Sequence, residues 1–166
     1  TQNGNNNAYN QDNATAWIDW QKSDPAFHRF VRRMIAFRRD HPVLRQSRFL
    51  HSRERALDGL EDIFWRRPDG APMQAADWDD PHTQCICVEL RTASGTPHYA
   101  ALEYAVFAVL NVGEECSVAV PQPPPGSLWS KRIDTAEPDS PAEQCGEGPV
   151  QVPADSVAIF TLDPAD

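Results

Sequence analysis

Acidic and histidine side chains crowd one short segment of this chain, where they could bind a metal ion. The segment DWDDPH contains three aspartates and a histidine within six residues: Asp77, Asp79, Asp80 and His82. Calcium takes about six to eight oxygen ligands, and the glycine and terminal glutamate of an EF-hand loop are missing. The sequence therefore predicts an acidic, solvated turn here and no metal site.

The cysteines offer a second set of reactive groups, at Cys85, Cys87, Cys116 and Cys145. They could form two disulfides in an oxidising compartment or none in the cytosol. Only one close pair exists, whereas a zinc site needs closely paired ligands. Because Cys85 and Cys87 lie two apart on one strand-like run, without the geometry usual for a bridge, we expect reduced thiols.

No other catalytic set is indicated. Ser, His and Asp are all present, but no G-x-S-x-G elbow surrounds a serine and no H-E-x-x-H pair occurs among the five histidines. Hydrolysis of a glycosidic bond with retention needs two carboxyl groups about 5 to 5.5 Å apart on rigid strands. Nothing in the sequence singles out such a pair, so we assign no catalytic residue, no metal and no cofactor.

Composition places these residues in a globular protein. The chain has 166 residues, of which 40% are hydrophobic and 23% charged, enough for one ordinary domain and an appendage. The net charge of -9 is unevenly divided: residues 1–67 hold 12 Lys and Arg against 8 Asp and Glu, and residues 68–166 hold 3 against 16. An acidic remainder would repel a polyanion, so we expect no nucleic-acid partner. No apolar run approaches the roughly 20 residues that cross a bilayer, which argues against a membrane span.

One helix is predicted near the start of the chain. Asp24 and Pro25 suit a first turn, and His41 and Pro42 end the helix. Between them an apolar stripe follows three-and-four spacing, while arginines occupy the outer face. The stripe consists of Phe27, Phe30, Val31, Met34, Ile35 and Phe37.

From residue 61 onward the pattern changes to short strands between loops rich in proline and glycine. The runs are DIFWRR, CICVELR, VFAVLNV, CSVAVP, SLWSKRID and SVAIFTL, and residues 101–109 are ambiguous but favour a strand. Six or more short strands without long helices predict a mainly β chain with an antiparallel β-sandwich.

Several sequence strings carry a resemblance: GNNNAYNQDN in the polar opening at 1–13, RRDHPVLR at 38–45, and PDG, M and DW within 68–78. In this order they resemble the last part of the isoamylase-type glycogen debranching enzymes, glycoside hydrolases with a (β/α)8 barrel. The resemblance implies that residues 1–55 are a remnant of the barrel (its last loop and one or two helices) and residues 56–166 a C-terminal β-sandwich. On this interpretation, the polar start is a cut end.

The resemblance also implies a function. The parent enzyme would hydrolyse α-1,6-glucosidic branch points of glycogen or limit dextrin in the cytoplasm, while this segment, lacking the catalytic carboxylates, would be structural and inactive alone. Its partners would be the rest of the barrel and, through it, branched α-glucan. The opening loop would edge the glucan cleft, unless its amides merely satisfy their own backbone. The residues concerned are Asn5, Asn6, Asn7 and Tyr9.

Two alternatives stay open. The sandwich could be an autonomous glucan-binding module that displays flat tryptophan rings, although Trp65 and Trp129 lie in strands and favour packing. The helix could also mediate self-association if its face with Phe27, Val31 and Met34 were exposed.

Overall fold

A computed structural model describes residues 12–14, 16–55, 58–97 and 105–165. The chain divides into two units, Thr1–Phe37 and Arg38–Asp166. The predicted division into a barrel remnant at 1–55 and a sandwich at 56–166 rests on the resemblance and stays a prediction.

The helical part of the chain begins with η2 (Trp20–Lys22), followed by α1 (Pro25–Asp40) and η3 (Pro42–Arg45). The predicted start of α1 is confirmed, because Asp24 Oδ1 accepts a hydrogen bond from Ala26 N at 2.8 Å. Arg45 satisfies two carbonyls at the other end, donating to the backbone oxygens of Arg38 and Arg39. No residue of α1 is buried.

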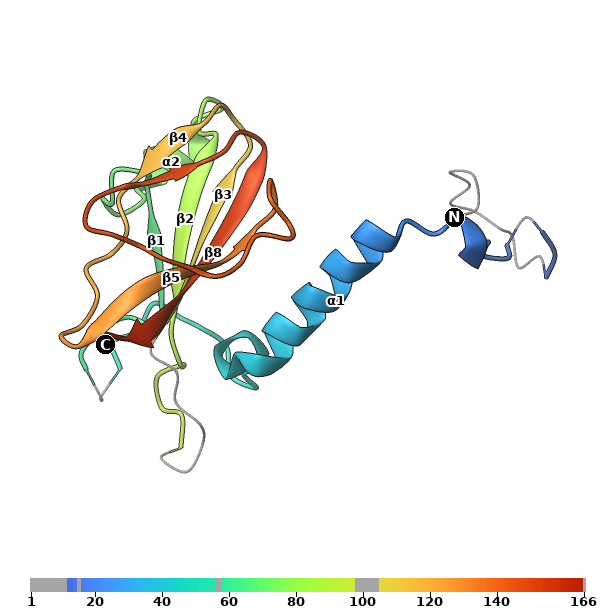
Figure 1. Ribbon diagram of the computed structural model, residues 1–166. Helices are drawn as coiled ribbons and strands as arrows, with labels where there is room; N and C mark the ends of the chain where they lie inside the picture. The colour runs from blue at the N-terminus through green and yellow to red at the C-terminus, as the bar shows by residue number, and fades with distance from the viewer. Residues whose placement is uncertain (1–11, 15, 56–57, 98–104, 166) are drawn as a thin grey trace. The chain divides into compact units, whose positions relative to one another are not determined.

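Most of the regular elements of the second unit are strands, with one short α-helix among them (Figure 1). The elements are β1 (Ile63–Arg66), α2 (Ala75–Asp79), β2 (Cys85–Leu90), β3 (Val106–Asn111), β4 (Cys116–Val118), β5 (Ser127–Asp134), β6 (Glu143–Gln144), β7 (Val150–Val152) and β8 (Ser156–Pro164). The mainly β class and all six predicted strands are confirmed. β6 lies in a stretch that the sequence indicates as loop, because two polar residues carry no alternating pattern.

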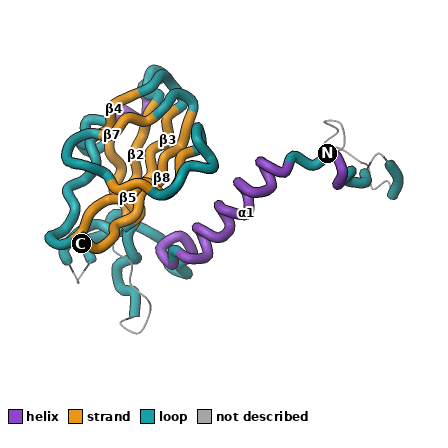
Figure 2. The backbone as a smooth tube through the Cα atoms, in the orientation of Figure 1, coloured by secondary structure: helices purple, strands orange, loops and turns teal. Residues whose placement is uncertain are grey.

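The strands form two antiparallel sheets of unequal size (Figure 2). Six strands follow the order β1-β2-β3-β8-β5-β6, and β4 pairs with β7 in the second sheet. Along β5 the register shifts between Lys131 and Ile133, which marks a β-bulge. The predicted sandwich therefore has one broad layer and one narrow layer.

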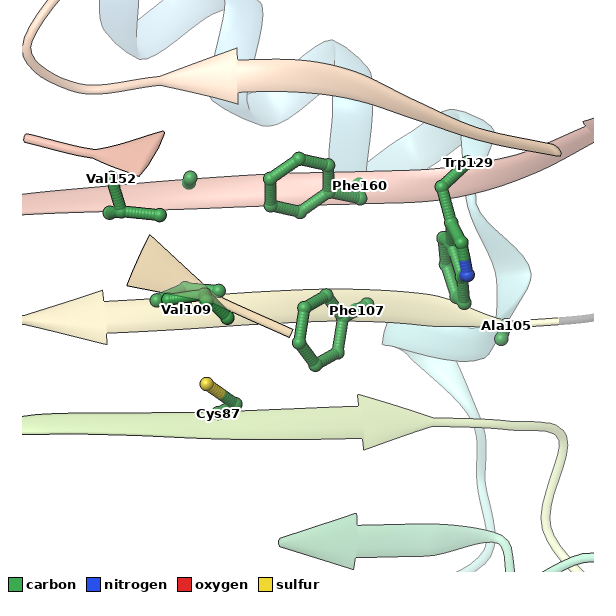
Figure 3. Packing of buried hydrophobic residues seen from close by; sticks show 9 residues of the cluster. Cys87, Ala105, Phe107, Val109, Trp129, Val152 and Phe160 are labelled. Carbon is green, nitrogen blue, oxygen red and sulfur yellow. The ribbon is translucent and has the colours of Figure 1, made fainter. Parts of the chain in front are cut away.

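The core fills the space between the two layers. Period-two alternation points Cys87, Phe107 and Phe160 from adjacent strands to the same face. Val118 of β4 and Val152 of β7, both fully buried, belong to the same cluster. Phe107 contacts Phe160 and Trp129 with ring centroids 5.8 Å and 5.9 Å apart (Figure 3). The narrow sheet thus covers the middle of the broad one.

Candidate functional site

The predicted glucan-contact residues lie outside the described part of the chain. Asn5, Asn6, Asn7 and Tyr9 belong to residues 1–11. Their role in glucan contact stays a prediction.

The acidic segment DWDDPH forms the short helix α2 and the turn that follows it. Asp77 Oδ2 accepts a hydrogen bond from Gln74 N at 2.7 Å, and the two residues form a capping box. Asp80 Oδ1 accepts from His82 N at 2.9 Å. Two of the four candidate ligands are thus engaged by local backbone, and no cluster of His, Cys, Asp or Glu in the described ranges could hold a metal ion. The segment is helical as far as Asp79 and forms a turn only at Pro81 and His82, so the predicted turn is right for its second half alone.

Trp78 of this helix packs against Trp65 of β1. The rings of Trp65 and Trp78 pack edge to face with centroids 5.3 Å apart. Trp78 is 51% exposed, whereas Trp65 is half-buried. Trp65 is a packing residue, as expected from the sequence. Trp78 lies on the short, capped helix α2, and part of its ring is exposed to solvent. This is the one exposed tryptophan in the described residues of the second unit.

Trp129 is buried, as expected for a core residue, with 3% of its surface exposed. Its Nε1 donates a hydrogen bond of 2.7 Å to the backbone oxygen of Pro121. The ring lines a groove of about 600 Å³, together with residues 119–123, 128 and 145–149. Because the indole is held below the surface, it cannot lie flat against a sugar.

Two arginines and a glutamate form a buried ion cluster on the core-facing side of β1 and β2. Arg66 Nη2 donates to Glu89 Oε2 at 3.1 Å, and Arg91 Nη2 donates to Glu89 Oε1. Glu89 is 2% exposed, so both oxygens of a buried carboxylate are occupied by guanidinium groups. The Arg66 guanidinium also lies over the Phe64 ring, 4.2 Å from its centroid. This arrangement links β1 to β2 and engages both oxygens of the carboxylate in ion pairs.

A second buried carboxylate, Asp62, joins two loops. Its Oδ1 accepts from His51 N at 3.0 Å, and its Oδ2 accepts from Ser94 N at 3.2 Å and Ser94 Oγ at 3.0 Å. Burial alone would raise the pKa of the Asp62 carboxyl, but these hydrogen bonds to the charged form lower it below its usual value. The Asp62 carboxylate therefore links the two loops in its ionised form, and its lowered pKa does not suit a general acid.

Two further cavities lie in this unit. One of about 250 Å³ is lined by Glu143 and Lys131 among others, and one of about 340 Å³ by Arg48, Phe49, His51, Arg53 and Ser94. The large groove contains Glu147. Each of these three cavities therefore has at most one carboxylate, whereas retaining glycoside hydrolysis uses two.

Glu89 and Asp62 were not identified from the sequence. The signal for Glu89 was present, because it shares the period-two face of Cys87 in the run CICVEL. For Asp62 no local signal exists, because its partner Ser94 is 32 positions away.

Curated proteins match most of this chain. A protein named isoamylase from Flavobacterium sp is 29% identical over 140 residues, which is 82% of this chain and 17% of that protein. A glycogen operon protein GlgX homolog from Mycobacterium tuberculosis is 32% identical over 146 residues, 83% of this chain and 20% of its own length. A glycogen debranching enzyme from Klebsiella pneumoniae is 33% identical over 90 residues, 54% of this chain and 13% of that protein.

The comparisons confirm the resemblance stated from the sequence. The chain spans 17% and 20% of the length of the first two relatives, so it corresponds to a part of such proteins. No family model matches the chain. No helix in the described ranges is long and apolar enough to cross a membrane.

Proposed function

We propose, from its homology to the isoamylase-type glycogen debranching enzymes, that this chain is the C-terminal segment of such an enzyme and has a structural role. The parent enzyme would hydrolyse α-1,6-glucosidic branch points of glycogen or limit dextrin in the cytoplasm. The observation that carries the proposal is the match of 83% of this chain to 20% of a GlgX homolog.

The absence of a carboxylate pair in the three cavities supports an inactive segment. Both well-buried carboxylates of the β1 and β2 region are occupied, Glu89 by two arginines and Asp62 by backbone and Ser94. The catalytic acids would then lie in the barrel that the rest of the parent enzyme supplies. The sandwich would cover the flank of that barrel, and α1 would be its last helix.

Activity measurements test this proposal. Release of reducing ends from glycogen by the isolated 166 residues should stay at background, while a full-length relative assayed beside it should debranch. In the relative, deletion of the segment that matches 56–166 should lower the thermal midpoint and with it the activity. Debranching by the isolated chain would refute the structural role.

A second candidate function is favoured by Trp78. Its half-exposed ring, held by Trp65 on a capped helix, could stack on the apolar face of a glucose unit, as in a glucan-binding module. Isothermal titration calorimetry with maltoheptaose separates the two functions. The structural role predicts no measurable heat of binding, whereas a binding module predicts saturable heat that Trp78→Ala abolishes. Trp20→Ala, which removes an exposed tryptophan of the first unit, is the control.

A further inference from the structure

Two thiols from different sheets approach each other at the margin of the core. Cys85 begins β2 in the broad sheet, and Cys116 begins β4 in the narrow sheet. Their sulfur atoms are 3.6 Å apart, although 31 positions separate the residues along the chain. Both side chains pack against the core cluster and are half-buried, so a small oxidant can reach them from the surface.

Geometry selects this pair among the four cysteines. Cys85 and Cys87 are alternate residues of one strand, an arrangement that rarely suits a bridge. Cys87 is fully buried, and Cys145 lies beside β5, where its backbone N–H donates to Trp129 O. A disulfide has an S–S length of about 2.05 Å, so the two sulfur atoms, now 3.6 Å apart, must approach each other by roughly 1.5 Å to form the bond.

We infer that Cys85 and Cys116 form an oxidative modification site, at which a hydroperoxide joins the two sheets by a disulfide. The Cys116 thiolate attacks the peroxide, the O–O bond breaks, and a sulfenic acid forms as one water leaves after protonation. The Cys85 sulfur then attacks the sulfenic sulfur, the S–O bond breaks, and a second water leaves. Two thiols thus lose two protons and two electrons, and one hydrogen peroxide takes them up to become two waters.

The surroundings make this reaction slow at neutral pH. Burial, the neighbouring Cys85 thiol and the Glu115 carboxylate raise the pKa of the Cys116 thiol to about 11. The pKa of Cys85 is also raised, by its hydrogen bond with Cys87 and by burial, although the Cys116 contact opposes this. Because the thiolate is the nucleophile, the rate should rise about tenfold per pH unit between pH 7 and 10. The site therefore forms its disulfide slowly, unlike a rapid peroxide sensor.

The bridge would fasten β4 to β2, and with it the narrow sheet to the broad one. It closes a loop of roughly 30 residues, for which the loss of chain entropy in the unfolded state predicts a rise in thermal midpoint on the order of 10 °C. A reductant such as dithiothreitol should reverse this rise.

Peptide mapping of the 166-residue chain tests the inference without any variant. After treatment with hydrogen peroxide at pH 9 and blocking of free thiols, trypsin separates the cysteines into the peptides 67–91, 92–131 and 133–166. We expect a disulfide between the first two and a fall in free thiols from four to two. Four remaining thiols, a link to 133–166, a bridge between two chains, or sulfinic acids without a bridge would each overturn it.

Single substitutions then assign the partner within 67–91. Cys85→Ser and Cys116→Ser should each abolish the bridge and the rise in thermal midpoint. Cys87→Ala and the matched control Cys145→Ser should keep both, with free thiols falling from three to one. Loss of the bridge in a folded Cys87→Ala chain, with retention in Cys85→Ser, would show that the pairing is wrong.

Discussion

Replacing Glu89 by glutamine tests the buried ion cluster while keeping the size of the side chain. In the wild type, Glu89 accepts hydrogen bonds from Arg66 and Arg91, whose side chains are 24% and 8% exposed. The variant removes the negative charge and leaves two guanidinium groups facing each other in a poorly solvated place. Two nitrogens of this cluster, Arg66 Nε and Arg91 Nη1, already have no hydrogen-bond partner in the described residues.

The expected loss is large because a partner of a buried ion pair is removed. Removing one charge of a buried ion pair lowers the free energy of unfolding by about 3 to 5 kcal/mol, and the partial exposure of Arg66 places this site near the lower end of that range. For a folded unit of this size, a loss of about 3 kcal/mol lowers the thermal midpoint by about 10 °C. That is a large share of the total stability, which is about 0.05 to 0.15 kcal/mol per residue.

Urea unfolding followed by circular dichroism measures the effect, with Glu143→Gln as the matched control. Glu143 lies 3.5 Å from Lys131 Nζ but its side chain is 71% exposed, so its loss should change stability by less than about 0.5 kcal/mol. The double variant Glu89→Met with Arg91→Met should recover part of the loss, since it removes a buried charge of each sign. A Glu89→Gln chain within about 1 kcal/mol of the wild type would refute the reasoning.

Two further predictions concern side chains held by hydrogen bonds. Asn111 Nδ2 donates hydrogen bonds to the backbone oxygens of Glu114 and Pro153. Asn111→Ala should therefore lower the free energy of unfolding, measured with urea, by about 2 kcal/mol. A change below about 0.5 kcal/mol would contradict this. The hydrogen bond from Arg55 lowers the pKa of Asp58, and the hydrogen bonds to Asp62 lower its pKa despite burial. The stability that these two carboxylates contribute is therefore complete above their unfolded pKa of about 3.9 and is lost as the pH falls through their folded pKa values. The urea concentration at the unfolding midpoint should thus decrease when the pH is lowered below about 4, and it should decrease less steeply in Asp62→Asn. A midpoint that does not change with pH down to about 2.5 would contradict this prediction.

Local patterns were sufficient to predict most elements of this chain. Asp24 and Pro42 bracket α1 because capping and the restrictions of proline act within a few residues. The run SLWSKRID coincides with β5, because it carries aromatic and aliphatic residues between two stretches rich in turn residues, which are also local signals. β7 escaped prediction because Val150–Val152 is too short to show a period.

The site depends on contacts that no local pattern contains. Glu89 meets Arg66 only because β1 and β2 pair with Arg66 opposite Cys87, and register is decided by the whole sheet. The approach of Cys85 to Cys116 likewise requires the narrow sheet to be placed over the broad one. The four glucan-contact residues lie outside the described ranges, so their prediction is still untested.

Both edge strands at the borders of the broad sheet, β1 and β6, are short. At one border, β6 contributes only two residues and pairs with only Ser130 and Lys131 of the eight residues of β5. At the other border, residues after β1 turn back, so that Met73 N donates to Trp65 O at 3.0 Å and Pro72, which has no N–H, bridges to Arg66. The β1 border therefore offers few vacant backbone donors and acceptors to a strand from another molecule, which disfavours sheet extension between copies along that border.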